Sequence, residues 1–172
     1  MRKILDLDFS VKDLGELRYF FGIKVARSDR GTMINQRKYA LDIVKDVGMQ
    51  DCVTTKFLYP TGTKLDNDEG EIFEDPESYI RLVGSLLYLN LTRPDLTFSV
   101  QQLSQYVSCP RKPHFNADLH VVRYLKGTTD LGLFFSRQNE HILFGYSDTD
   151  WGSCAHNGRS LLTGFMFFWE LS

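Results

Sequence analysis

The chain has 172 residues, 42% of them hydrophobic, and a formal net charge of -2. This length and composition indicate one or two small globular domains and exclude a fibrous or largely disordered chain. The three cysteines lie far apart in the sequence, so we expect neither a zinc ribbon nor a disulfide scaffold, and a reducing compartment is the simplest setting. No apolar run reaches the roughly 18 residues that span a bilayer, so we expect no membrane partner.

Charge varies along the chain. Lys and Arg outnumber Asp and Glu by ten to seven over residues 1–50 and by seven to three over residues 81–137, whereas residues 51–80 carry two basic and eight acidic residues. Basic blocks of this kind suit the phosphate backbone of a nucleic acid. Solvated helix faces produce similar charges, so charge alone leaves both interpretations open.

The first predicted elements are a β-hairpin and a helix. Residues 17–25 are aromatic and β-branched, and a polar turn separates them from the β-prone residues 32–35. Apolar residues then recur at helical spacing over residues 36–47, and Gly48 follows where a C-terminal cap is typical.

An acidic linker and a buried helix come next. Residues 51–75 lose the apolar period and are rich in acids and turn residues, which predicts an exposed connection. Residues 76–91 present a wide apolar face and predict a well-buried helix. Gly84 lies inside this helix, and we expect it to mark a close contact with another helix.

Two further helices are predicted before the chain changes to strands. Thr92-Arg93-Pro94-Asp95 combines a likely N-cap at Thr92 with an acid three residues later, which predicts a helix running to about Val107. A fourth helix is predicted over residues 113–127. The period then shifts to two, which predicts strands over residues 131–135, 142–146 and 163–168.

Asp148 and Asp150 follow directly on a predicted strand. Residues i and i+2 of a strand face the same side, so both carboxylates would point to one spot. Such a pair suits Mg²⁺, which is bound through one or two carboxylates and often serves phosphodiester hydrolysis. A polar turn that ends the strand explains the same pattern.

Other polar residues give weaker signals. The four histidines have no metal-binding spacing, and we expect most of them on the surface. Arg111-Lys112 and residues 123–126 carry basic groups near an aromatic ring, which fits a nucleic-acid backbone. An ordinary solvated helix surface is the alternative.

Six sequence blocks in a fixed order carry a family resemblance. They are FSVKDLGELRYFFGI (9–23), QRKYA (36–40), VGSLLYL (83–89), TRPD (92–95), RYLKGT (123–128) and GYSDTDWGSC (145–154). Together they resemble the Gag-Pol polyproteins of copia-type plant retrotransposons, and also plant mitochondrial hypothetical proteins derived from such elements. The last block resembles the opening strand of that family's RNase H.

The resemblance implies roles for individual residues. The hairpin would be primer-grip-like, and the helix after it would begin the thumb, with Arg37, Lys38 or Lys45 against the duplex backbone. Arg123 and Lys126 would add basic contacts from the helical connection. The partners implied are an RNA–DNA hybrid or DNA duplex, held through its backbone without sequence specificity, and the remainder of the polyprotein.

The resemblance also implies a metal site. Asp148 would be the first, vestigial catalytic acid of the RNase H, and Asp150 a less certain metal ligand, with Mg²⁺ as the cofactor of the parent enzyme. The polymerase centre of the family needs an adjacent Asp pair, which this chain lacks. After Asp150 the only acid is Glu170, whereas two metal ions need further carboxylates. We therefore expect no activity from this chain alone.

The predicted fold class is α+β. It comprises an N-terminal β-hairpin plus helix (1–50), an acidic linker (51–75), a central helical connection (76–128) and a partial RNase H-like β-sheet (129–172). The function expected is that of a fragment of a reverse transcriptase and RNase H polyprotein, intracellular in its parent. A domesticated, non-catalytic module that binds nucleic acid or protein is the alternative. A nuclease completed by acids from another chain is a second one.

Overall fold

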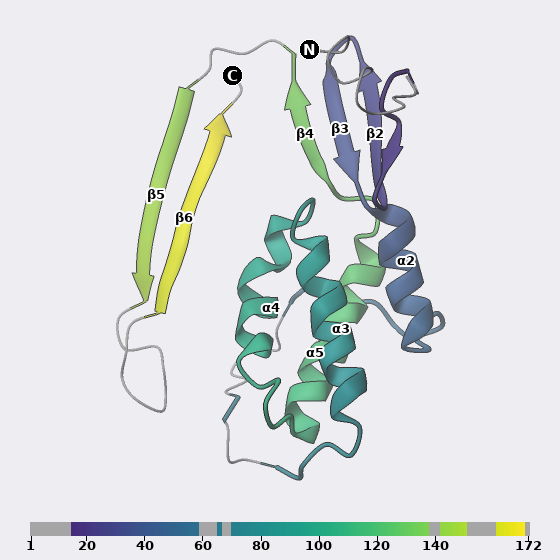
Figure 1. Ribbon diagram of the computed structural model, residues 1–172, viewed down its shortest axis with the longest axis vertical. Helices are drawn as coiled ribbons and strands as arrows, with labels where there is room; N and C mark the ends of the chain where they lie inside the picture. The colour runs from purple at the N-terminus through teal and green to yellow at the C-terminus, as the bar shows by residue number, and fades with distance from the viewer. Residues whose placement is uncertain (1–14, 59–64, 67–69, 138–141, 151–160, 171–172) are drawn as a thin grey trace, which may run out of the picture.

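The computed structural model describes residues 15–58, 65–66, 70–137, 142–150 and 161–170, the last two ranges as backbone only. A four-stranded sheet stands at one end of a group of helices, and a two-stranded ladder completes the described chain (Figure 1). The mixed content confirms the α+β class. None of the helices described is long and apolar enough to cross a membrane.

The sheet is antiparallel throughout and has the order β1-β2-β3-β4. Its strands are β1 (Tyr19–Phe20), β2 (Ile23–Ser28), β3 (Gly31–Asn35) and β4 (Leu133–Ser136). The predicted hairpin is therefore confirmed as β2 and β3. The strand expected over 131–135 also forms, but it pairs with β3, Leu133 opposite Ile34, and not with the C-terminal strands.

Two glycines allow β4 to approach β3. A Cβ at Gly31 would lie 2.1 Å from the carbonyl oxygen of Phe135, and one at Gly132 would lie 2.2 Å from that of Ile34. No side chain can occupy either position without a backbone shift. These glycines explain how a strand far along the chain completes the N-terminal sheet.

The helices share one hydrophobic core. They are α2 (Arg37–Asp46), α3 (Pro76–Leu89), α4 (Thr97–Ser104) and α5 (Lys112–Gly127), with a 3-10 turn at Pro94–Leu96. Ile43 of α2 is buried in the same cluster as Leu86 of α3 and Val121 of α5. The predicted linker therefore does not separate two cores.

The first turn of α3 is fixed as the sequence indicates. Asp75 is the N-cap, its carboxylate accepts a hydrogen bond from the Ser78 amide (3.1 Å), and Pro76 occupies the first helical position. The expectation for Gly84 is wrong. Gly84 is exposed, and a Cβ there would meet nothing within 4 Å, so no helix packs on it.

The expectation for Thr92 is also wrong. Its hydroxyl does not cap a helix but donates to the Gln36 side-chain oxygen (2.8 Å), where both residues are buried. A buried hydroxyl gains more from a tertiary acceptor than from an exposed helix end. The helix after it starts as the 3-10 turn and ends at Ser104, earlier than predicted.

The C-terminal strands are longer than predicted. β5 (Ile142–Asp150) and β6 (Leu161–Glu170) form an antiparallel pair, with a register irregularity between Tyr146 and Asp148. Among the described residues no other strand joins this pair. A two-stranded ladder is common to many folds, so the RNase H-like assignment remains a prediction.

Candidate nucleic-acid interface

The turn between β1 and β2 presents an exposed aromatic tip. Phe20 pairs with Ile23, so Phe21 and Gly22 form a two-residue turn, and both have positive φ angles, 45° and 77°. Two-residue hairpin turns favour Asn, Asp or Gly there, since other residues are strained at positive φ. Phe21 is nonetheless 74% exposed. Backbone strain that displays a large apolar side chain indicates a functional surface.

The tip is attached to α3. The Tyr88 hydroxyl donates a hydrogen bond to the backbone oxygen of Phe21. The Tyr88 ring also meets the Tyr39 ring of α2 edge to face, with centroids 5.2 Å apart. The tip, α2 and α3 therefore meet at one side chain, which sequence analysis did not identify.

Beside this contact, an uncharged stripe runs along α3 and into the turn after it. Ile80, Gly84, Leu87 and Leu91 follow one another at helical spacing, and all four are exposed. Gly84 leaves open space in the middle of this stripe. A flat partner can therefore approach the α3 backbone closely.

A shallow groove of about 240 Å³ lies between α2 and α3. Apolar side chains of both helices and Phe115 line it, and Asp46 and Arg81 add opposite charges. This volume is small for a substrate pocket, so we assign no ligand to it.

The predicted basic residues of α2 are accessible. Arg37 forms an exposed ion pair with Asp130. Lys38 and Lys45, two turns apart on α2, are exposed and have no recorded partner among the described residues. Lys38 and Lys45 are therefore free to meet phosphates.

The two predicted basic residues of α5 differ. Arg123 is exposed. Lys126 is partly buried, and its ammonium group donates to the backbone oxygen of Cys52 (2.6 Å). The structure thus gives Lys126 a structural partner, whereas Arg123 remains available.

The predicted acidic linker lies along α5 as a strap, by which we mean the described residues 51–58, 65–66 and 70–75. Its backbone oxygens accept hydrogen bonds from α5 or the residue before it. The pairs are Lys126 with Cys52, His120 with Phe57 (3.0 Å), His114 with Asp66 (2.9 Å) and Arg111 with Gly70 (2.6 Å). The strap runs antiparallel to α5 and occupies much of its basic surface.

Ionisable groups at the start of α5 respond to these contacts. Lys112 forms an ion pair and hydrogen bond with Glu71, which raise the pKa of Lys112 and lower the pKa of Glu71. His114 is buried, so it is not one of the histidines on the surface. Its burial, with the Arg111 charge, lowers its pKa despite the Asp66 carbonyl. Its Nδ1 accepts from the Arg111 amide (3.1 Å), so its Nε2 donates to Asp66.

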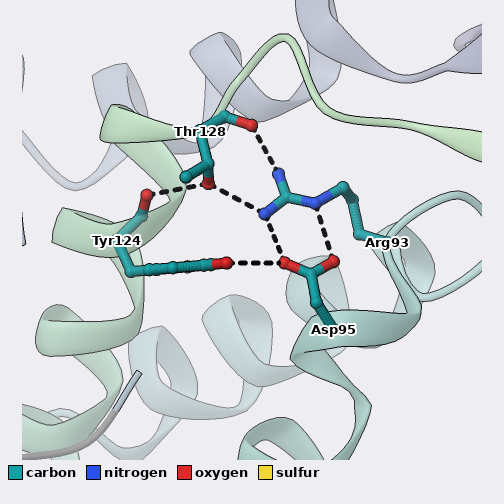
Figure 2. Close-up of polar contacts among 4 residues, drawn as sticks. All are labelled: Arg93, Asp95, Tyr124 and Thr128. Carbon is teal, nitrogen blue, oxygen red and sulfur yellow. Dashed lines mark hydrogen bonds and ion pairs between the residues drawn. The ribbon is translucent and has the colours of Figure 1, made fainter. Parts of the chain in front are cut away.

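A polar cluster joins the turn after α3 to the end of α5 (Figure 2). The Arg93 guanidinium binds both carboxylate oxygens of Asp95 (2.9 and 2.7 Å) and both the backbone and hydroxyl oxygens of Thr128 (2.8 Å each). The Tyr124 hydroxyl donates to Asp95 (3.0 Å). The TRPD and RYLKGT blocks are thus the two halves of one contact.

The pKa values within this cluster follow from its geometry. Burial alone raises the pKa of Asp95, but the hydrogen bonds and charge of Arg93, with the Tyr124 hydroxyl, outweigh it and hold that pKa below its usual value. Burial and the Asp95 carboxylate raise the pKa of Tyr124. Asp95 is therefore ionised and paired at neutral pH.

Asp118 lies on the buried face of α5 with no partner. It is fully buried, and neither carboxyl oxygen has a hydrogen bond within the described protein. Burial raises the pKa of Asp118 well above its usual value. Burial is the cause of this shift, so placing the carboxyl group here costs folding free energy.

The predicted acid pair lies near the end of β5. Asp148 is opposite Thr163 and Asp150 opposite Leu161 in the ladder with β6. The structure describes only the backbone of Asp148 and Asp150, so the directions of their carboxylates stay a prediction. Within the described part of the chain, no three His, Cys, Asp or Glu residues come together as metal ligands. Their metal-binding role remains a prediction.

Retrovirus-related Pol polyproteins of transposons are among the known proteins that this chain is similar to. The retrovirus-related Pol polyprotein from transposon RE2 of Arabidopsis thaliana is 42% identical over 83% of this chain, and that from transposon TNT 1-94 of Nicotiana tabacum is 32% identical over 95%. The matched parts are 10% and 13% of those polyproteins. An uncharacterized mitochondrial protein of Arabidopsis thaliana is 35% identical over 95% of this chain and 68% of its own length. No family model and no solved structure matches the chain.

Proposed function

Because the chain belongs to the copia-type, retrovirus-related Pol polyproteins of retrotransposons, we propose that its hairpin and helices hold the nucleic-acid duplex for the reverse transcriptase of such a polyprotein. The observation that carries this proposal is the hydrogen bond between Tyr88 and the backbone of Phe21. It unites the strained aromatic tip and the uncharged stripe of α3 into one exposed surface.

The chemistry of this surface suits the minor groove of an A-form duplex. That groove is wide and shallow and displays sugar hydroxyls and base edges. Uncharged side chains around an open glycine fit such a surface, and aromatic side chains at the tip suit the sugars and bases of a strand end. Lys38 and Lys45 of α2 supply the phosphate contacts, and Arg37 and Arg123 extend them.

The proposed partner is an RNA–DNA hybrid or a DNA duplex, bound without sequence preference. Lys126 is not part of the interface, because its ammonium group is bound to the strap. Polymerase and RNase H activity belong, in this proposal, to the longer polyprotein. Asp148 and Asp150 would serve its RNase H with Mg²⁺, as the first acid and a neighbouring ligand.

Duplex binding tests the proposal through its salt dependence. We expect log K of an RNA–DNA hybrid to fall linearly with log salt, with a slope near -0.9 for each phosphate neutralised. Replacing Lys38 and Lys45 with Gln should reduce the steepness by about 1 per residue. Lys126→Gln is the matched control, since it also removes one positive charge from a helix. We expect it to leave the salt slope unchanged, because the Lys126 ammonium group is bound to the strap. Salt-independent binding, or no binding, would refute the proposal.

A second experiment tests the uncharged stripe. Gly84→Leu places a bulky group where the duplex backbone should approach, so we expect lower affinity with an unchanged salt slope. Gln101→Leu, which adds bulk at an exposed position of α4 outside the stripe, is the control for surface change alone. Equal affinity of wild type and Gly84→Leu would exclude α3 from the interface.

Activity assays separate this proposal from the nuclease alternative. We expect no primer extension by the purified chain, because it contains no adjacent Asp pair. Cleavage of the RNA strand that depends on Mg²⁺ and is lost in Asp148→Asn would instead favour a nuclease.

A further inference from the structure

The sheet and the helices are joined at one junction. In the described part of the chain, the backbone passes from β3 to α2 at Gln36 and returns from α5 to β4 through residues 128–132. Both passages touch the same turn after α3. Thr92 binds the Gln36 side chain (2.8 Å), and Arg93 binds Thr128.

Arg93 makes the larger share of these contacts. Its side chain is only 3% exposed, and its guanidinium bonds two residues at once, Asp95 and Thr128. Thr128 is the C-cap of α5, where the backbone carbonyls favour a positive charge. A lysine offers a point charge and cannot reproduce this planar fork.

At the Gln36 side of the junction, some buried polar atoms lack a hydrogen bond within the described residues. The side-chain nitrogen of Gln36 and the side-chain oxygen of Asn90 are both buried without a hydrogen-bond partner in the described protein. One is a donor and the other an acceptor, and both flank the turn at Thr92. Within the described protein, the Gln36 side chain is therefore bound only through Thr92, whereas Arg93 makes four hydrogen bonds.

We infer that Arg93 is a positioning residue that fixes the sheet, and with it the Phe21 tip, at a set angle to α3. Its hold on Thr128 fixes where β4 leaves α5, and β4 in turn pairs with β3. The hydrogen bond of Tyr88 to the Phe21 backbone joins the same sheet to α3, so we expect it to depend on this angle. The consequence for duplex binding rests on the proposed function, whereas the mechanical role does not.

Amide hydrogen exchange on the full chain tests the mechanical role. In Arg93→Lys we expect faster exchange at the paired amides of β3 and β4, with unchanged exchange in α3 and α5. Val100→Ala is the matched control, because Val100 is fully buried in α4 and its apolar side chain makes none of the hydrogen bonds of the junction. It should speed exchange in helices and sheet alike. If Arg93→Lys folds poorly, Thr128→Val tests the same contact, because it removes the hydroxyl that accepts from Arg93 and should change exchange in the same direction.

Affinity for an RNA–DNA hybrid tests the consequence. At a temperature where all variants are folded, we expect Arg93→Lys to bind about tenfold more weakly than Val100→Ala of equal Tm, a factor equivalent to 1.4 kcal/mol. Equal effects of the two variants on exchange and affinity would overturn the inference and leave Arg93 a general stabilising residue. Absence of binding by the wild type would refute the proposed function alone, since the exchange result still decides the role of Arg93.

Discussion

Asp118 opposes the fold, because its carboxyl group is buried without a hydrogen bond within the described residues. Its folded-state pKa is raised by burial, so the folded chain holds a proton that the unfolded chain releases near its ordinary pKa. The stability that depends on this proton is complete below the unfolded pKa. It is lost as the pH rises through the folded pKa, so Asp118 destabilises the protein increasingly toward the alkaline side.

Replacing Asp118 tests this cost. We expect Asp118→Ala to raise the free energy of unfolding at pH 7.5 by roughly 1–3 kcal/mol, the usual cost of a buried unsatisfied polar group. The gain should be smaller at pH 4, where the folded group is protonated and the unfolded group is already about half protonated. Urea denaturation at the two pH values measures it. Asp95→Asn is the opposite control, because the lowered pKa of Asp95 contributes stability that is lost as the pH falls. An unchanged pH profile in Asp118→Ala would contradict the assignment.

Gly84 and Gly132 should respond in opposite ways to replacement by alanine. Gly84 lies in open space within α3, so Gly84→Ala should stabilise the chain by about 0.5–1 kcal/mol through helix propensity. Gly132→Ala should destabilise it, because the new Cβ would meet a backbone oxygen at 2.2 Å. Thermal unfolding of the two variants gives the sign of each change. Stabilisation by both would disprove the close approach of β4 to β3.

Among the elements, the helices could be predicted from the sequence, whereas the contacts of the strap with α5 could not. The helical spacing of apolar residues gave α2, α3 and α5 nearly to their ends, because each buries one face in a common core. The strap contacts α5 mainly through backbone oxygens. Every residue type carries that group, so no side-chain pattern in residues 51–75 could reveal which basic residues it would occupy.

The candidate interface was predicted only in part, for a similar reason. Lys38 and Lys45 were found because exposed basic residues are visible in a helical pattern. The hydrogen bonds of Tyr88 with Phe21 and of Arg93 with Thr128 join residues that are distant in sequence. One sequence alone does not show that such residues are in contact. The positive φ of Phe21 carries no composition signal, although the neighbouring Gly22 is a hint of a tight turn.

The β1–β2 turn offers a test of stored strain. Asn tolerates positive φ better than Phe, so we expect Phe21→Asn to slow amide exchange in β1 and β2. Affinity for an RNA–DNA hybrid should fall, since the exposed ring is lost. Phe20→Leu, in a strand with ordinary geometry, is the control and should show no gain in protection. If the Phe21→Asn variant binds the hybrid as well as the wild type does, the strained Phe21 turn has no role in duplex binding.

Across the whole molecule, burial is concentrated in the helices. Phe134 and Phe135, neighbours that face opposite sides of the sheet, are 51% and 47% exposed. Neither face of the sheet is therefore well covered within the described residues. A sheet in this state adds little to stability and leaves apolar surface for a partner.

Local stability should follow this distribution. We expect the slowest amide exchange in α3 and α5, faster exchange in β2 and β3, and the fastest in β5 and β6, which consist of one isolated strand pair. Exchange measured on the intact chain checks the order. Protection in β5 and β6 as strong as in α3 would show that residues 142–170 have a core of their own.

The pairing of Ile34 with Leu133 has a consequence for synthesis. A ribosome releases β3 long before β4, so the nascent chain carries an unpaired edge at β3 while all the helices are being made. Such an edge can template pairing with neighbouring chains. A chain translated from a message that ends before Gly132 should therefore accumulate as insoluble product on polysomes. A chain translated from a message that extends past Ser136 should remain soluble.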